Sequence, residues 1–264
     1  MKKLIALLLA LTLALALFGC TPSKTPTTPS EGPTTPSEGP TTPIDDPAKK
    51  SEGVMTYAEY IAAADQAEVK IEAYVQATQS WWDNKITIYA QDTEGGYFLY
   101  NMACSEADAA KLTPGTKIRA TGSRTTWAGE IEIMEGSLEI LEGNYIAEAT
   151  DVTALLDSED LIKHQNKFVT FKGMTVEASN EEGAAFLYNW DGSGAEGSDS
   201  DLYFKASVGG KTYTFVIEYY LTGADSDAYK AVQNLKVGDK IDMEGFLYWY
   251  EDVQPHITSV TAAK

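Results

Sequence analysis

Aromatic side chains are the residues of this sequence whose type and spacing point most directly to chemistry. Trp81 and Trp82 stand side by side after an alternating hydrophobic segment, and Trp127 and Trp249 follow two later segments. Flat rings stack on sugar rings, bases or peptide groups, so these residues predict a ligand-binding surface. The same rings would equally well fill the interior or join two parts of the fold, and both interpretations stay open. The predicted ligand-binding set is Trp81, Trp82, Tyr89, Tyr97, Trp127 and Trp249.

Acidic residues form the second group of candidates. Glu130, Glu132 and Glu135 have the residue type of catalytic carboxylates, but Glu130 and Glu132 alternate along an expected strand. We therefore predict that they lie on its solvent-exposed face. The acidic Gly/Ser-rich stretch 191–201 has oxygen ligands that Ca²⁺ accepts, yet its spacing is not that of an EF-hand, which favours a solvated loop.

Sulfur and imidazole groups are few. Cys104 has no second cysteine for a disulfide once Cys20 is used as described below, and it is predicted to be a small buried hydrophobic residue. His164 and His256 are far apart in sequence, which argues against a zinc site. Motifs for a serine nucleophile, a phosphate loop or a zinc protease are lacking. We predict no catalytic residue, no metal site and no cofactor, and a protein that is not an enzyme.

The elements that must position these residues are strands. Val69, Ile71, Ala73 and Val75 alternate with polar residues and should face a core, as should Ile86, Ile88 and Ala90 in the next segment. A turn at residues 94–96, a third strand, a short helix over 105–112 and strands from Thr116 and Glu130 follow. Thr56 or Met55 is expected to cap a short helix before the first strand.

A repeat extends this pattern to the rest of the chain. The segment Leu112-Thr-Pro-Gly115-Thr-Lys-Ile118 matches Leu235-Lys-Val-Gly238-Asp-Lys-Ile241 in spacing, and each is followed by a glycine, Gly122 or Gly245, and then a tryptophan. A second copy of the same domain is therefore predicted.

The predicted order of strand, strand, strand, helix, strand, strand resembles the OB-fold, a five-stranded Greek-key barrel. With the strand Lys85–Asp92 and the repeated Gly-x-Lys-Ile segment, the chain resembles tandem OB-like bacterial lipoproteins of uncharacterised function. The resemblance implies a mainly β protein with two tandem OB-like five-stranded barrels, each with a short helix between strands 3 and 4. It also implies that the loops carrying Trp81, Trp82 and Trp127 flank a ligand-binding face.

The first residues predict export. Residues 1–20 comprise Lys2 and Lys3, an aliphatic run and the sequence Leu17-Phe18-Gly19-Cys20. The run is too short to span a bilayer comfortably. The last four residues resemble the lipobox cut by lipoprotein signal peptidase, which implies a signal peptide and lipidation of Cys20 by palmitate-like acyl chains. Two acyl chains suffice for stable anchoring, so we expect a protein held at the cell membrane and facing outside the cytoplasm.

Residues 21–53 are predicted to be a disordered Pro/Thr-rich tether. Eight of the ten prolines lie between Pro22 and Pro47, and the heptad Thr-Thr-Pro-Ser-Glu-Gly-Pro begins at Thr27 and again at Thr34. Such a segment has little to bury and cannot offset the entropy of ordering. The domain organisation predicted is thus a signal peptide at 1–20, the tether at 21–53 and OB-like domains at 54–146 and 147–264.

The charge balance constrains the partners. The formal net charge of the chain is -19, which opposes binding to nucleic-acid backbones because these require Lys and Arg. We therefore predict a non-catalytic binding module for a glycan or peptide, with the membrane as a partner through the lipid and with no expectation of nucleic acid. The alternatives are a nucleic-acid-binding OB-fold protein and a structural or interaction protein of the cell envelope.

Overall fold

The structure of the protein is a computed structural model that describes residues 46–264, all within one compact unit. Cys20, the signal segment 1–20 and residues 21–45 of the predicted tether lie outside the described residues, so the predictions for them are untested. None of the helices between residues 46 and 264 has the length and apolar character that crossing a membrane requires.

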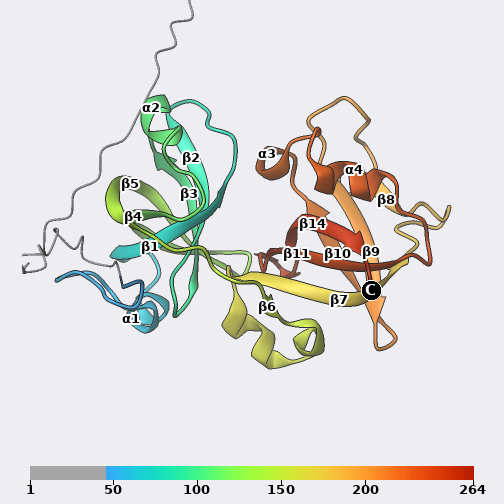
Figure 1. The fold of residues 1–264 in the computed structure, drawn as a ribbon, viewed down its shortest axis with the longest axis horizontal. Helices are drawn as coiled ribbons and strands as arrows, with labels where there is room; N and C mark the ends of the chain where they lie inside the picture. Colours follow the sequence, from blue (N-terminus) through green and yellow to red (C-terminus); the bar gives the residue numbers. More distant parts are fainter. Residues whose placement is uncertain (1–45) are drawn as a thin grey trace, which may run out of the picture. The chain divides into compact units, whose positions relative to one another are not determined.

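The first barrel is closed, with its strands in the order β1-β2-β3-β5-β4 (Figure 1). All neighbours pair antiparallel except β3 and β5, which are parallel, as in a Greek-key barrel. Its strands are β1 (Glu68–Thr78), β2 (Lys85–Gln91), β3 (Gly96–Ala103), β4 (Thr116–Trp127) and β5 (Glu130–Asn144), and its helices are α1 (Tyr57–Ala62) and α2 (Glu106–Ala109).

The alternating residues of β1 and β2 build the core of this barrel, as predicted. Helix α1 begins after Thr56, whose side chain and that of Glu59 form a capping box. This places Tyr60 inside the barrel, where it is fully buried. The helix therefore contributes a core side chain, because the capping box sets where the helix begins and so which residues face the barrel.

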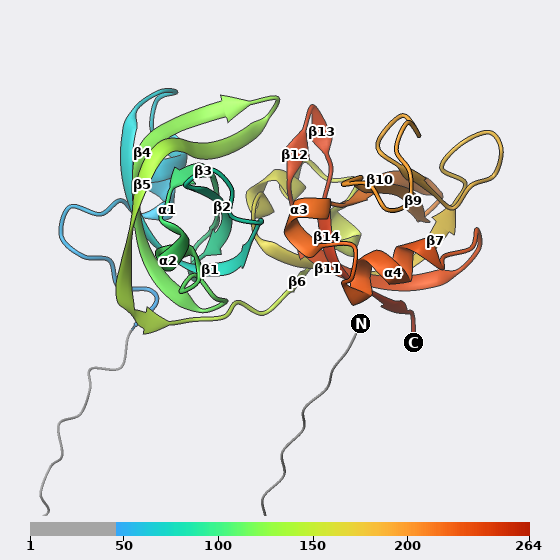
Figure 2. The ribbon, with the colours of Figure 1, turned by 90° about the horizontal axis from the view of Figure 1, so that it is seen from above.

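The second barrel closes through pairing of β7 with β9 at one end of a seven-stranded sheet of order β6-β7-β11-β14-β10-β9-β8. Its strands are β6 (Thr150–Asp151), β7 (Phe168–Glu177), β8 (Phe186–Tyr188), β9 (Leu202–Val208), β10 (Lys211–Ile217), β11 (Lys240–Phe246) and β14 (His256–Ala262). Its helices are the 3₁₀ turns η1 (Thr153–Leu155) and η2 (Glu159–His164) and the α-helices α3 (Tyr219–Thr222) and α4 (Asp227–Gln233). A hairpin of β12 (Trp249–Tyr250) and β13 (Asp252–Val253) interrupts the connection from β11 to β14 (Figure 2).

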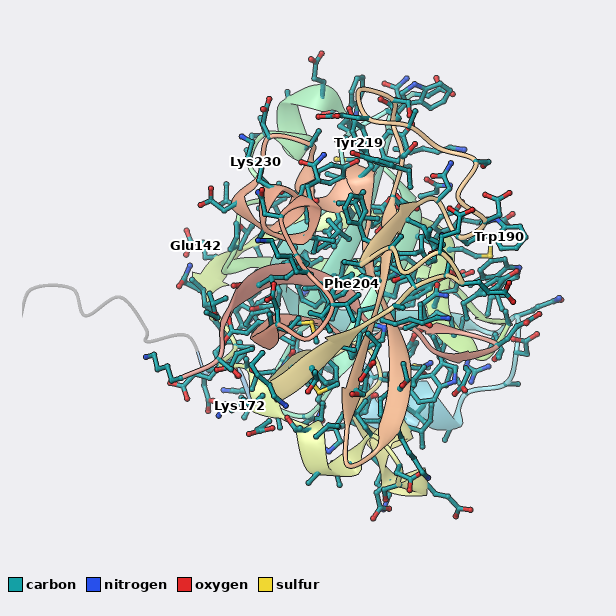
Figure 3. The ribbon with its side chains drawn as sticks, turned by 90° about the vertical axis from the view of Figure 1, so that its right-hand side faces the viewer. Glu142, Lys172, Trp190, Phe204, Tyr219 and Lys230 are labelled. Carbon is teal, nitrogen blue, oxygen red and sulfur yellow. The ribbon has the colours of Figure 1, made fainter. Side chains whose placement is uncertain are left out.

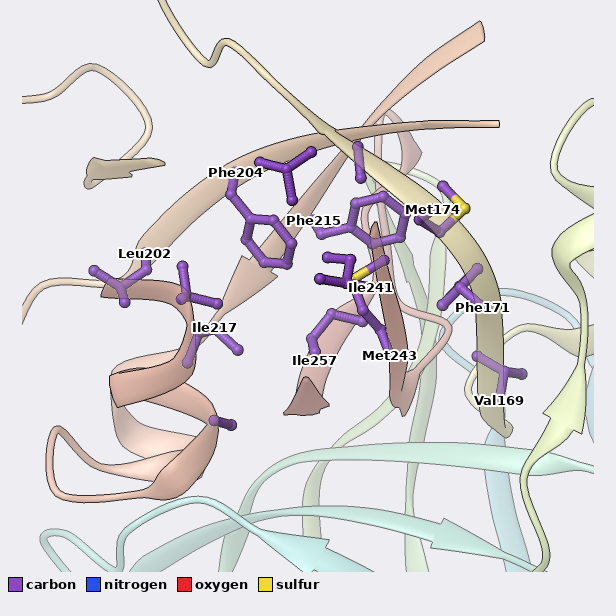
Figure 4. Close-up of a cluster of buried hydrophobic side chains, with 14 of the residues drawn as sticks. Val169, Phe171, Met174, Leu202, Phe204, Phe215, Ile217, Ile241, Met243 and Ile257 are labelled. Carbon is purple, nitrogen blue, oxygen red and sulfur yellow. The ribbon is translucent and has the colours of Figure 1, made fainter. Parts of the chain in front are cut away.

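Aliphatic side chains packed around the rings of Phe171, Phe204 and Phe215 fill the interior of the second barrel (Figure 4). The ring centroid of Phe215 lies 5.1 Å from that of Phe171 and 5.7 Å from that of Phe204. With helix α4 between β10 and β11, this barrel repeats the order of the first. The predicted fold class, two tandem OB-like five-stranded barrels with a short helix between the third and fourth strands, is confirmed.

The repeated segments adopt the same backbone conformation. Gly115 and Gly238 stand at equivalent places, directly before or near the fourth strand of their barrels, and their φ angles are 93° and 94°. Such angles are accessible to glycine at little cost but strain other residues. The conserved spacing within the chain thus encodes one turn used twice.

The two barrels are joined by a buried aromatic contact. The ring of Tyr89 stacks on that of Phe246 with centroids 4.3 Å apart, and the ring of Phe98 meets that of Tyr248 edge-on at 5.2 Å. Gly96 permits close approach, because a Cβ atom there would lie 2.2 Å from the carbonyl carbon of Asn166. One of the two predicted roles of the aromatic residues, joining the copies, is thus realised by some of them.

Candidate functional site

The two adjacent tryptophans of the first loop separate in the structure. The indole Nε1 of Trp81 donates a hydrogen bond of 2.9 Å to the carbonyl of Cys104, and its ring packs against the first core. Trp81 therefore closes a barrel end. Trp82 is 74% exposed and retains a free ring.

Tyr89 and Tyr97 are both fully buried, and they face opposite ways. Antiparallel pairing sets Tyr97 opposite Ala90, an inward residue, whereas Tyr89 stands opposite Phe98 on the outside of the barrel. The Tyr97 hydroxyl donates to Asp92 Oδ2 at 2.7 Å. Tyr97 thus points into the barrel and Tyr89 out of it, a difference that depends on the register of β2 and β3 and cannot be derived from either strand alone.

Trp127 remains at the surface and pairs with Tyr250, a residue outside the predicted ligand-binding set. Its ring centroid lies 5.1 Å from that of Tyr250, and the two side chains are 51% and 42% exposed. Trp127 ends β4 and Tyr250 ends β12, so equivalent loops of the two barrels supply the two rings. The backbone N–H of Glu251 donates to the carbonyl of Ala128 at 2.6 Å, which fixes these loops to each other.

Trp249 faces away from this pair and is half-buried against the second core. Its backbone N–H donates to Glu130 Oε2 at 3.0 Å. Of the six predicted residues, the structure leaves Trp82 and Trp127 exposed as single large rings, and Trp127 alone of these two has an aromatic partner. We call Trp127 and Tyr250 the aromatic pair.

The outward face of β2, β3 and β5 next to the aromatic pair is largely covered by the second barrel. In OB-folds this face and the flanking loops take ligands. Here the Tyr89 hydroxyl is 2.7 Å from His256 Nδ1, and the same nitrogen is 3.2 Å from Glu218 Oε2. The ring of Tyr248 stacks on that of His256 at 4.2 Å. Sequence reasoning missed this cluster because its members are up to 167 residues apart.

The prediction that Glu130 and Glu132 are solvent-exposed is wrong. Glu130 is fully buried and Glu132 is 5% exposed. Glu130 accepts hydrogen bonds from Asn166 Nδ2 at 2.5 Å, from the Trp249 N–H at 3.0 Å and from Gln165 Nε2 at 3.2 Å. The alternation of the strand was identified correctly, but the face that it predicted to be solvated lies under the second barrel.

Burial governs the protonation of both carboxyl groups. It raises the pKa of Glu130 to about 8, although the hydrogen bonds from Asn166 and the Trp249 N–H favour the ionised form. Burial also raises the pKa of Glu132 to about 7. Glu135, three residues further along the strand, is exposed.

The remaining candidates lie apart from the aromatic pair. Cys104 is buried, as predicted, and burial raises the pKa of its thiol. Across residues 46–264 there is no group of three or more His, Cys, Asp or Glu side chains that could hold a metal ion, the acidic stretch 191–201 included. Trp190 projects from the loop that begins this stretch and is 74% exposed (Figure 3).

Comparison with known proteins shows similarity in structure alone. No family model matches the sequence, and no curated protein matches it either. Among solved structures, the p204 HINb domain matches 76% of this chain and 99% of its own, with 14% identity and a TM-score of 0.33. The Ifi202 HINa domain in complex with 20 bp double-stranded DNA matches 75% of this chain and all of its own, with 10% identity and a TM-score of 0.33.

A murine DNA-binding protein bound to double-stranded DNA matches 74% of this chain and 96% of its own, with 10% identity and a TM-score of 0.33. These DNA complexes overturn our prediction that nucleic acid is not to be expected as a partner. Structures with TM-scores of 0.33 and identities of 10–14% are similar to this chain in fold alone. The ligand of this chain therefore has to be inferred from its own residues.

Proposed function

We propose that this chain is a non-catalytic binding protein that takes a ring-bearing polymer, an oligosaccharide or a single-stranded oligonucleotide, on its aromatic pair. The observation that carries the proposal is the exposed contact of Trp127 with Tyr250 at 5.1 Å between ring centroids. Large exposed rings that touch each other and come from two loops are a surface suited to stacking.

The position of the pair supports the proposal. Both rings lie on loops between the fourth and fifth strands of their barrels, and such loops bind oligonucleotides and oligosaccharides in OB-folds. The hydrogen bond from Glu251 to Ala128 holds the loops together before any ligand arrives. A surface that is already ordered loses less conformational entropy on binding.

Substitution of the aromatic pair tests the proposal. Trp127→Ala and Tyr250→Ala should each weaken binding about tenfold or more, because loss of one stacking ring costs about 1–3 kcal/mol. Isothermal titration calorimetry with chito-oligosaccharides, cello-oligosaccharides and oligo-dT measures the effect. Trp190→Ala is the control, since Trp190 is more exposed than either ring of the pair and lies outside it. Unchanged affinity in both pair variants, for every polymer that binds, would reject the aromatic pair as the binding surface.

Nucleic acid is the second candidate because the same rings stack bases of any sequence. With a formal net charge of -19, the chain would have to bind by stacking more than by phosphate neutralisation. Oligo-dT binding should then depend only weakly on salt. A steep loss of affinity with salt would indicate instead a basic contact surface away from the aromatic pair.

We further propose that the protein is a lipoprotein anchored through Cys20 at the cell membrane and facing outside the cytoplasm. The support is the order of charged, aliphatic and lipobox-like residues in the first twenty positions. Mass spectrometry of the protein from membranes should find its N-terminus at a diacylated Cys20. A mature N-terminus elsewhere, or an unmodified thiol at Cys20, would reject the anchor and leave the binding proposal intact.

A further inference from the structure

Glu132 is a nearly buried carboxyl group without a partner. It is 5% exposed, and within residues 46–264 no hydrogen bond or ion pair reaches it. Glu130, on the same strand face, accepts three hydrogen bonds from the second barrel. The Glu132 oxygens do not belong to the fully buried polar atoms that lack a partner, so part of this carboxyl group reaches solvent. Unlike Glu130, it can therefore accept a hydrogen bond from a donor outside the chain.

The strand register places an accessible ring beside this carboxyl group. Glu132 pairs with Phe98 of β3 on one side and with Thr125 of β4 on the other. Tyr100 follows Phe98 on the same face of β3, with the two ring centroids 6.2 Å apart, and is 39% exposed. Tyr248 of the second barrel meets Phe98 edge-on with ring centroids 5.2 Å apart, and its hydroxyl is close enough to both Glu132 and Tyr100 to interact with them electrostatically.

Among the charged and titratable groups around Glu132, no cation of residues 46–264 forms an ion pair with it. Glu130 precedes it on β5, and Tyr60 approaches from the core. Tyr100 and Tyr248 approach from β3 and from the second barrel. On β4, Arg124 Nη1 donates to Asp65 Oδ1 and Thr126 Oγ1, whereas its buried Nε has no hydrogen-bond partner among residues 46–264. When Glu132 ionises, it therefore has no ion-pair partner among residues 46–264, and a cation from outside the chain can compensate its charge.

We propose that Glu132 and Tyr100 bind an organic ammonium group carried by the ligand, with Tyr248 bounding the site. The inference rests on the proposed function and names the chemistry of its ligand. The carboxylate accepts a charge-assisted hydrogen bond from the ammonium group, and the face of an aromatic ring attracts a cation. The free amine of an amino sugar in an oligosaccharide carries this group, and the amine of a lysine derivative serves as the comparison.

The experiment compares amines with their neutral acetylated forms. Nα-acetyl-lysine amide and glucosamine should bind the full chain, whereas Nα,Nε-diacetyl-lysine amide and N-acetylglucosamine should bind at least tenfold more weakly in calorimetry. Which amine binds more tightly identifies peptide or glycan as the source. Glu132→Gln should lower amine affinity tenfold or more, Tyr100→Ala should lower it severalfold, and the control Glu135→Gln should leave it unchanged. Equal binding of the amine by wild type and Glu132→Gln would overturn the site.

The pH profile separates this role from a structural one. Only the ionised carboxylate attracts the ammonium group, so lysine-amide affinity should rise with pH and level off above the pKa of Glu132, about 7. Glu132→Gln should remove that rise, and an unaltered rise would count against the site. Trp127→Ala should weaken the polymers but spare the small amines. If Trp127→Ala leaves polymer binding unchanged while Glu132→Gln still lowers amine affinity, the aromatic pair is rejected and the ammonium site stands. If Trp127→Ala weakens polymer binding while Glu132→Gln leaves amine affinity unchanged, the ammonium site is rejected and the aromatic pair stands.

Discussion

Glu130 and Glu135 lie on one strand, yet their carboxyl groups have opposite environments. Glu130 is enclosed by the second barrel and hydrogen-bonded to it, whereas Glu135 faces solvent. The cost of desolvating the charged form outweighs the three N–H donors, so burial leaves the pKa of Glu130 at about 8. At neutral pH the protein therefore keeps a proton on this carboxyl group that the unfolded chain would release.

This proton makes stability depend on pH. The pKa of Glu130 is raised from 4.5 to about 8 on folding, so the free energy of unfolding should be constant below the lower value and fall as pH rises between the two. The slope that one such group contributes is at most about 1.4 kcal/mol per pH unit. Urea denaturation across this range measures it, and Glu130→Gln should flatten the profile.

Glu132 adds a slope of the same sign up to about pH 7, so Glu132→Gln should make the decline less steep below that pH and leave it unchanged above. Glu135→Gln serves as the control because its side chain is exposed. A stability profile that stays as steep in Glu130→Gln as in the wild type would contradict the assignment.

At the scale of the element, the two barrels differ in the loop between their fourth and fifth strands. The connection between the fourth and fifth strands is a tight turn at Ala128 and Gly129 in the first barrel, but contains the β12–β13 hairpin in the second. That hairpin places Tyr250 against Trp127 on one side and Trp249 against the second core on the other. One short insertion thus produces both an exposed ring pair and a packing contact.

At the scale of the whole molecule, the contact of Tyr89 and Phe98 with Phe246 and Tyr248 makes the barrels depend on each other. All four side chains are at most 8% exposed. The Tyr89 hydroxyl and His256 Nδ1 are hydrogen-bonded to each other across it. The part of the outer face of the first barrel that carries Tyr89 and Phe98 is therefore buried inside the molecule.

Phe246→Ala should weaken this contact. Truncation of a buried Phe costs about 3–5 kcal/mol, and the lost stacking on Tyr89 should let the barrels unfold in separate steps. Differential scanning calorimetry should show two transitions where the wild type shows one. Phe204→Ala, in the interior of the second barrel, should lower stability without exposing the contact with the first. A single transition in Phe246→Ala would show that other contacts keep the barrels coupled.

The sequence by itself determined the elements and their repetition. Alternation identified the inward residues of β1 and β2, because side-chain direction in a strand has a period of two. The matched spacing around Gly115 and Gly238 revealed a second barrel, because equivalent turns need glycine at equivalent positions. These signals are local, since each depends on residues within one or two neighbouring elements.

Only the tertiary structure decided which outward faces meet water. Tyr89 and Glu130 both point out of the first barrel, as their strands require, but the second barrel covers them. The ring of Trp127 contacts that of Tyr250, a residue more than a hundred positions away in the sequence. Burial and pairing of this kind depend on packing between distant segments, and such packing produces no periodic pattern in the sequence of either segment. For that reason the predicted ligand-binding set contained both exposed and buried rings.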